Sequence, residues 1–270
     1  MPYIQDNGVK LWYDITGSGE PLVLTGGYLL LHHQFDWIVD LLAKDFQVIS
    51  WNYRGAGHSD RRWDGGYCLE RYVDDLDCIL NSLGLKKVNL WGTSTGSTVT
   101  IRYTAKYQER VKSMISYCMI TTAAYRKAYQ FFTSIGEEFG FEALANFLAW
   151  IAVADHHQFT PMANKIALHD ARSMQEIVSV ESLAKTSETF SHLDLTSELE
   201  KVKVPTMLLV GNSGKVGSDN PSVGQLVKDF LEHCKHAKLV TIKDTGGTFS
   251  MYEKPEETAE AVKKFIKSLP

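Results

Sequence analysis

Short apolar runs alternate with segments of helical periodicity along most of the chain. Before residue 120 the runs of strand length are, in order, 9–15, 21–25, 46–51, 87–91 and 111–119. Apolar residues at helical spacing fill the segments 69–83 and 97–107. Strands that alternate with helices are typical of a mostly parallel sheet covered by helices on both faces. The pattern therefore predicts an α/β fold.

The alternation is interrupted between residues 120 and 195, where the pattern is helical and aromatic residues are frequent. Beyond this stretch the two patterns return, with strands at 204–210 and 238–242 and helices at 222–233 and 255–269. We expect residues 1–119 and 196–270 to form one α/β core and residues 120–195 to form a helical cap. A cap inserted between two parallel strands would cover their carboxyl ends, where open α/β sheets bind ligands.

Composition narrows the partners that the chain could bind. The formal net charge is −4, so no basic surface for nucleic acid or an anionic membrane is expected. No apolar run approaches the ~18–20 residues that span a bilayer, and residues 1–6 do not resemble a signal peptide. Cys68, Cys78, Cys118 and Cys234 are widely spaced, which is typical of free thiols in a reducing compartment. These features predict a cytoplasmic protein that binds a small molecule and holds no cofactor; a homodimer is left open.

The strongest local signal is Gly92-Thr93-Ser94-Thr95-Gly96, which matches G-x-S-x-G between a predicted strand and a predicted helix. The turn is so tight that its flanking positions must be small, and the central serine is held in a strained conformation with its hydroxyl above the sheet. The N–H of Thr95 would lie at a helix N-terminus, where the dipole favours developing negative charge. The segment therefore predicts a nucleophile elbow.

Further segments resemble the α/β-hydrolase superfamily over nearly the whole chain. They are Leu24–Gly27, similar to the oxyanion loop; Asn52–Asp60, similar to the D-x-R-G-x-G-x-S-D loop; Val202–Gly211, similar to the strand that carries the catalytic acid; and Glu253–Glu257, similar to the helix start after the catalytic histidine. The resemblance implies the α/β-hydrolase fold, with Ser94 in the nucleophile position. It also implies an oxyanion hole formed by the N–H groups of Thr95 and Gly27.

The matching positions do not carry the family's other catalytic residues. A gap-free match of residues 247–255 places Thr248 where the family has its histidine. Gly214 stands where the acid is expected, and Thr25 stands at the histidine of the oxyanion loop. A serine hydroxyl is a weak nucleophile without a base, and the loss of a triad member costs several orders of magnitude in rate. The sequence therefore does not predict an ordinary acyl-enzyme mechanism for Ser94.

Other residues are candidates for the rest of the site. His33, next to His32, follows the oxyanion loop and is the candidate for a displaced base, although a solvated or structural role is the simpler interpretation of any single histidine. No pair of histidines has the spacing of metal ligands, so we predict no metal. The residues expected to bind substrate are Tyr28, Thr93, Phe132 and Trp150.

Three functions remain open on this evidence. The first is a non-hydrolytic lyase, cyclase or isomerase that polarises the carbonyl of a small apolar molecule with the oxyanion hole and the hydroxyls of Ser94 and Thr248. The second is a hydrolase of a small ester or lactone with a displaced histidine such as His33. The third is a binding or scaffold protein, because the C-terminal third also resembles the N-myc downstream-regulated family, which has this fold without a working triad. The shared features are Gly211–Ser213, Pro221–Val223, Thr245–Gly247 and a closing amphipathic helix. The intact elbow favours a small-molecule pocket, and the fold alone cannot choose among the three.

Overall fold

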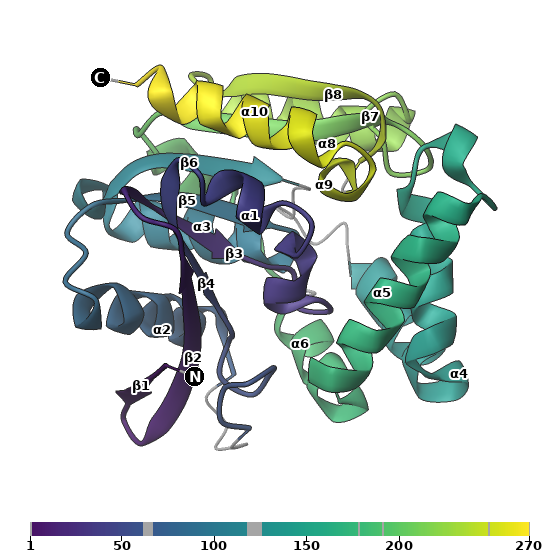
Figure 1. Cartoon of the computed structure of the whole chain (residues 1–270), viewed down its shortest axis with the longest axis horizontal. Coiled ribbons are helices and arrows are strands. Elements are labelled where there is room, and N and C mark those ends of the chain that lie inside the picture. Colours follow the sequence, from purple (N-terminus) through teal and green to yellow (C-terminus); the bar gives the residue numbers. More distant parts are fainter. Residues whose placement is uncertain are drawn as a thin grey trace.

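The computed structural model describes residues 2–61, 67–117, 126–177, 179–190, 192–247 and 249–269. Within these ranges eight strands form one sheet in the order β1-β2-β4-β3-β5-β6-β7-β8 (Figure 1). The strands are β1 (Tyr3–Asp6), β2 (Val9–Thr16), β3 (Glu20–Thr25), β4 (Phe46–Trp51), β5 (Val88–Thr93), β6 (Val111–Tyr117), β7 (Thr206–Ser213) and β8 (Lys238–Gly246). β2 is antiparallel to both β1 and β4, and the strands from β4 to β8 in the sheet run parallel.

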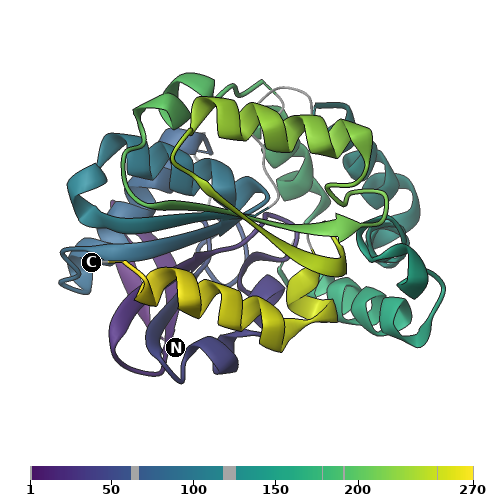
Figure 2. The ribbon, with the colours of Figure 1, turned by 90° about the horizontal axis from the view of Figure 1, so that it is seen from above.

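Helices cover both faces of this sheet, as Figure 2 shows for α8 above it and α10 below it. The helices that pack together on one face are α2 (Leu69–Ser82), α3 (Thr95–Lys106), α7 (Thr196–Lys201) and α8 (Pro221–His233). Those on the other face are α1 (Val39–Leu42), α9 (Ser250–Glu253) and α10 (Pro255–Lys267). Every residue of β5 is buried between the two layers, and the polar Asn89 within it is satisfied by hydrogen bonds with Glu20 and Ser113.

Of the described α-helices between β6 and β7, three stand at one end of the sheet (Figure 1). They are α4 (Arg126–Ala152), α5 (Pro161–Ile177) and α6 (Val180–Phe190). α4 is broken at Gly140, whose φ of 81° and ψ of 173° are not helical, so its two halves can fold against each other. These helices lie at the carboxyl ends of β5 and β6, the end of the sheet at which Ser94 follows β5.

Two further connections are short helical turns that bear on the site. The 3₁₀ helix η1 (Leu31–Phe35) follows β3, and η4 (Asp155–His157) joins α4 to α5. The 3₁₀ helix η2 (Gln108–Arg110) precedes β6. None of the described helices is long and apolar enough to cross a membrane.

The predicted fold class is confirmed, and most strand and helix positions agree with the pattern. The strand predicted at 46–51 has those limits, whereas residues 118–119 of the strand predicted at 111–119 lie outside the described residues. The sequence analysis missed β1, although Asn7-Gly8 is a favoured pair for a tight hairpin turn. Both residues have positive φ, 47° and 82°, as a type I′ turn requires.

The loop after β4 is held by a buried ion pair. Arg54 donates to the carboxylate of Asp75 on α2, with 2.9 Å between Nε and Oδ2, and also to Asp6 at 2.6 Å. Asp75 is fully buried, and this burial raises the pKa of its carboxyl to about 6 although Arg54 opposes the change. The pair fixes the loop that runs from Asn52 to Asp60 beside β3 and η1.

Candidate active site

The elbow has the geometry that the motif predicts. Ser94 has φ 54° and ψ −125°, a conformation that costs energy for a residue other than glycine. Its N–H donates to the carbonyl of Tyr117 at 3.0 Å. A Cβ atom at Gly96 would lie 1.9 Å from the carbonyl oxygen of Thr25, and one at Gly92 would lie 2.4 Å from Thr100 Oγ1. The two glycines are therefore required by close packing against β3 and within α3.

The oxyanion loop is tied to the elbow by hydrogen bonds. The N–H of Tyr28 donates to Thr95 Oγ1 at 2.7 Å, and the Tyr53 hydroxyl donates to the carbonyl of Gly26 at 2.7 Å. Thr25, at the position of the family's histidine, accepts a hydrogen bond from Trp51 Nε1 at 3.1 Å. The loop is thus fixed from both sides before any ligand binds.

A side chain that the sequence analysis missed occupies the predicted oxyanion hole. The N–H of Gly27 donates to Gln34 Oε1 at 2.7 Å, and Gln34 is buried. Because a backbone N–H needs an acceptor, this bond also fixes which end of the carboxamide carries the oxygen. Gln34 Nε2 donates to none of the described residues and is not fully enclosed, so it presents N–H groups to the cavity that Gln34 lines.

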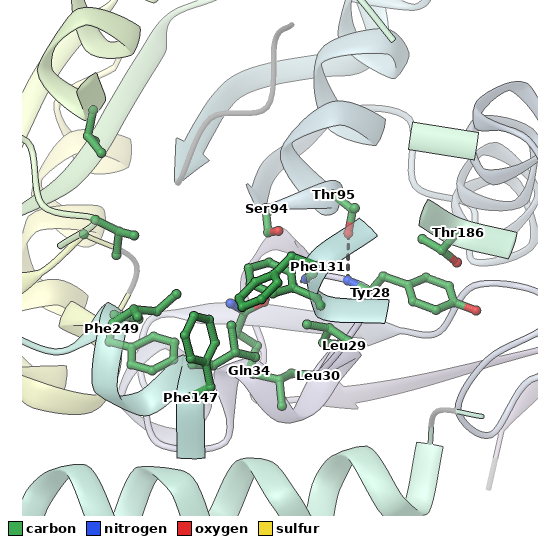
Figure 3. A pocket seen from close by; sticks show the side chains of 18 of the residues that line it. Tyr28, Leu29, Leu30, Gln34, Ser94, Thr95, Phe131, Phe147, Thr186 and Phe249 are labelled. Atoms are coloured by element: carbon green, nitrogen blue, oxygen red, sulfur yellow. Dashed lines mark hydrogen bonds between the residues drawn. The ribbon is translucent and has the colours of Figure 1, made fainter. Parts of the chain in front are cut away.

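Above the elbow lies a cavity of about 360 Å³, near the lower end of the range for small-molecule sites (Figure 3). Its polar side chains are those of Tyr28, Gln34, Ser94, Thr95 and Thr186. The rest of the described lining is apolar or glycine: Gly27, Leu29, Leu30, Phe131, Phe132, Phe147, Leu148, Ile151, Ala152, Leu183, Val210, Val216, Val223, Leu226, Val227, Gly247 and Phe249. No described residue of this lining is a histidine, a carboxylic acid or a base.

Several of the predicted site residues meet at this cavity. Ser94, Thr95, Gly27, Tyr28 and Phe132 all line it. Burial raises the pKa of the Tyr28 hydroxyl, which lies beside Ser182 and Thr186 of α6, so this group stays protonated at neutral pH (Figure 3).

Two residues predicted to bind substrate do not line the cavity. Thr93 is completely buried at the end of β5, beneath the elbow. Trp150 lies on α4 with 38% of its surface exposed, and its ring contacts Phe147 and Phe159 instead. The position of Thr248 falls outside the described residues.

The position expected to hold the acid has no room for a side chain. Gly214 follows β7 with φ 81°, in the region that favours glycine. A Cβ atom there would lie 2.3 Å from the carbonyl oxygen of Val153, at the end of α4. Glycine at this position therefore reflects close packing of the loop against the cap helices, and an aspartate would require that packing to change.

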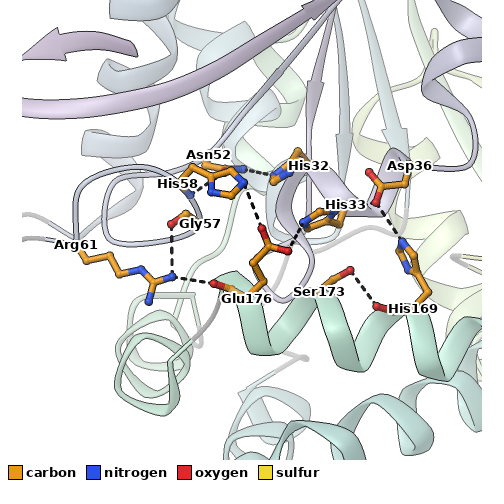
Figure 4. Close-up of polar contacts among 10 residues, drawn as sticks. All are labelled: His32, His33, Asp36, Asn52, Gly57, His58, Arg61, His169, Ser173 and Glu176. Carbon is orange, nitrogen blue, oxygen red and sulfur yellow. Dashed lines mark hydrogen bonds and ion pairs between the residues drawn. The ribbon is translucent and has the colours of Figure 1, made fainter. Parts of the chain in front are cut away.

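His33 lies outside the cavity lining, in a polar cluster where α5 meets η1 (Figure 4). Its Nδ1 is 2.7 Å from Asp36 Oδ2, and its Nε2 is 3.7 Å from Glu176 Oε2. Burial lowers the pKa of the neighbouring His32 to about 3, and His32 Nδ1 lies 2.8 Å from Asn52 Nδ2. The structure thus directs these two histidines towards other polar groups rather than into the cavity with Ser94. Within the described ranges, no group of histidine, cysteine and acidic residues has the geometry of a metal site.

His169 of α5 joins the cap to this cluster and is expected to make stability depend on pH. Burial alone would lower its pKa, but hydrogen bonds with Asp170 and Asp36 outweigh burial and raise the pKa to about 9. Stabilisation by the protonated ring is complete below pH 6.5, the ordinary value, and is lost as pH rises through about 9. We expect roughly 1–2 kcal/mol of unfolding free energy to be lost in this window.

Urea denaturation of the wild type and of His169→Gln at several pH values would measure this effect. The wild type should lose more stability than the variant between these limits. Replacing the exposed His156 with glutamine serves as the control. Equal pH dependence of the wild type and His169→Gln would rule out this role for His169.

A second buried carboxylate fastens the end of α4 to the core. Glu253 accepts hydrogen bonds from the N–H groups of Ala154 at 2.9 Å and Gly246 at 2.6 Å. Its Oε1 also lies 2.5 Å from His157 Nδ1. The side chain of Glu253 is fully buried, so these donors replace the water that the charge loses.

The chain matches, over residues 20–255, the model of the family described as the alpha/beta hydrolase fold. It belongs to this family. Among curated relatives, the "AB hydrolase superfamily protein YisY" of Bacillus subtilis is 24% identical over 266 residues, covering 96% of each chain. The "cis-3-alkyl-4-alkyloxetan-2-one decarboxylase" of Shewanella oneidensis is 26% identical over 295 residues, covering 98% of this chain and 87% of that one.

Solved structures agree with this assignment. A thermophilic esterase from Thermogutta terrifontis superposes on the chain with a TM-score of 0.81 at 21% identity, covering 99% of this chain and 98% of the esterase. At this identity the likeness shows the fold alone. Because the names of these relatives include both an esterase and a decarboxylase, family membership leaves the reaction of this chain open.

Proposed function

We propose that this chain binds a small, uncharged, apolar carbonyl compound and converts it by lyase, cyclase or isomerase chemistry, without an acyl-enzyme. The observation that carries the proposal is the composition of the cavity. Ser94 and Gln34 are polar groups in an otherwise largely apolar lining, and no described residue of that lining can act as a base for Ser94. A charged ligand would lose its hydration in such a cavity without finding a counter-ion.

The polar groups of the cavity are suited to polarise a carbonyl rather than to attack it. The N–H of Thr95 lies at the N-terminus of α3, where the dipole stabilises negative charge on a ligand oxygen. The Ser94 hydroxyl and Gln34 Nε2 offer further hydrogen-bond donors in the same space. Fixed donors of this kind stabilise an enolate or oxyanion as it forms, and the protein need not reorganise at that moment.

The environment of Gly214 supports the non-hydrolytic reaction. A triad needs an acid to orient its histidine, and the loop at the acid position is packed against the Val153 carbonyl. The decarboxylase of Shewanella oneidensis also supports it, since that relative is named for a reaction other than hydrolysis on a cyclic ester with two alkyl substituents.

Two measurements test this proposal. A fluorophosphonate probe labels activated serines, so we expect the wild type to remain unlabelled, like Ser94→Ala, while an active serine esterase run beside them is labelled. A panel of neutral ketones, esters and lactones is then incubated with the wild type in oxygen-labelled water and followed by mass spectrometry. The expected product contains no more oxygen from water than a sample without protein, since ketones exchange their oxygen with water unaided.

Labelling of Ser94, or incorporation of water oxygen that Ser94→Ala abolishes, would contradict the proposal and show a hydrolase with a displaced base. Recovery of every panel member unchanged, although some of them bind tightly, would contradict the catalytic part and leave a binding protein.

A further inference from the structure

A continuous line of aromatic rings runs from the cavity to the surface of the cap. Phe131 and Phe147 both line the cavity, and their ring centroids are 5.2 Å apart. Phe131 is nevertheless 51% exposed, so it lies at the mouth of the cavity. Phe147 contacts Trp150 at 6.0 Å, and Trp150 contacts Phe159 at 6.4 Å. We call these four residues the aromatic track.

The outer end of the track is unusual for a protein surface. Phe159 is 83% exposed and follows η4 in the left-handed region, with φ 60°. A bulky residue rarely adopts this conformation, which costs roughly 1–2 kcal/mol. The ring contacts Trp150, but this contact leaves most of the apolar surface of Phe159 exposed. Strained residues of this kind cluster at ligand-binding sites.

We propose that the ligand of the cavity is an amphiphile whose apolar tail leaves the cavity at Phe131 and lies along the aromatic track. Its neutral carbonyl head would lie at Ser94 and Gln34. This inference rests on the proposed function, because it names the substrate class of the same cavity. A cavity of about 360 Å³ holds the head and the first part of the tail, and the track extends the apolar surface for the remainder.

Continuity with the cavity favours a ligand tail over other occupants of the track. Phe131 and Phe147 belong to both surfaces, so an apolar chain leaving the cavity meets the track without crossing a polar residue of the lining. An anionic membrane surface is disfavoured by charge. Glu137, Glu138 and Glu142 lie on α4, the helix that carries three of the four track residues, and the whole chain has a net charge of −4.

The test measures binding, so that it does not depend on turnover. Isothermal titration with a series of unreactive linear alkan-2-ones, each below its solubility limit, gives affinity as a function of chain length. In the wild type, affinity should rise about fourfold for each added methylene, including chains too long for the cavity. In the double variant Trp150→Ala with Phe159→Asn the rise should stop earlier. The longest ketone should then bind at least tenfold more weakly than it binds the wild type, with the shortest unchanged.

Matched variants keep the result specific. Asparagine is tolerated at positive φ, so Phe159→Asn removes the ring and keeps the backbone conformation. Phe139→Ala is the control. Phe139 lies on α4, as Trp150 does, and is 69% exposed, but it is not part of the track. If the double variant keeps the wild-type dependence on chain length, or if Phe139→Ala changes it equally, the inference is wrong.

Two other outcomes separate this inference from the proposed function. Failure of every ketone to bind the wild type would overturn the proposed function and the inference together. Self-association of the wild type is measured by sedimentation. A dimer that the double variant abolishes, with no change in ketone affinity, would show that a second copy of the chain covers the track.

Discussion

Replacing Gln34 with leucine is expected to weaken the binding of a short ketone by about 10- to 100-fold. The substitution removes the N–H donor that Gln34 Nε2 presents to the cavity, and it leaves the buried N–H of Gly27 without its acceptor. Without this donor the buried carbonyl of the ligand is unsatisfied, which costs about 1–3 kcal/mol, and tenfold in affinity corresponds to about 1.4 kcal/mol. The unpaired N–H of Gly27 is present in both the free and the bound variant, so it lowers the stability of the fold rather than the affinity. Calorimetric titration of the wild type and the variant measures the change.

Gln34→Glu separates the two roles of this side chain. An ionised carboxylate can still accept from the N–H of Gly27, but it offers no donor to a carbonyl. Burial raises the pKa of a carboxyl, so binding is compared at a pH high enough to keep the variant ionised. We therefore expect Gln34→Glu to lose ketone binding as Gln34→Leu does. A rise in affinity in Gln34→Leu would mean that the N–H of Gly27, once released, is the better donor and that Gln34 only masks it.

Introducing the missing acid by Gly214→Asp is expected to cost more than about 3 kcal/mol of unfolding free energy and to give no serine hydrolase. The Cβ atom would lie 2.3 Å from the Val153 carbonyl oxygen, and the positive φ of Gly214 adds a cost of about 1–2 kcal/mol. The new side chain would meet the main chain of Val153 and Ala154 rather than a flexible side chain, so little can move to relieve the clash. Urea denaturation measures the loss, and fluorophosphonate labelling of Gly214→Asp combined with Thr248→His tests the activity.

Gly8 provides a matched control for the energetic cost of a side chain at positive φ. Its φ is 82°, against 81° for Gly214, but a Cβ atom at Gly8 would meet nothing within 4 Å. Gly8→Ala should therefore cost only the conformational term, about 1 kcal/mol, and Gly214→Ala at least 2 kcal/mol more. Equal losses at the two positions would show that the loop around Gly214 moves readily and that the acid position is not closed.

The fold and the elbow could be predicted because each depends on local pattern. The strand β5 carries Val88, Leu90 and Trp91 because both faces of it are covered. Gly92 and Gly96 are fixed by a turn whose motif spans only five residues. Periodicity and a short motif carry this information directly. The closure of the Gly214 position has no such signal, because the carbonyl that fills it belongs to Val153, far away in the sequence.

The choice between His33 and Gln34 could not be made from the sequence. Both lie on η1, which was not predicted and which begins at Leu31, a residue with φ 48°. Successive residues of a 3₁₀ helix point about a third of a turn apart, so only one of two neighbours can face the cavity. The chain places Gln34 there and turns His33 towards Asp36. His33 was the candidate because its side chain can act as a base, but the orientation of η1 places Gln34 at the cavity instead.

Glu253 ties the end of α4 to the core and so limits how a ligand can enter and leave the cavity. Swinging the end of α4 outward would strip a buried carboxylate of the N–H groups of Ala154 and Gly246 at once, and an unpaired buried charge costs several kcal/mol. Opening by a hinge at this end would therefore be slow and rare. Rotation of an exposed ring such as Phe131 takes only picoseconds to nanoseconds. The residence time of a ligand would then be set by its own apolar contacts at the mouth rather than by a movement of the backbone.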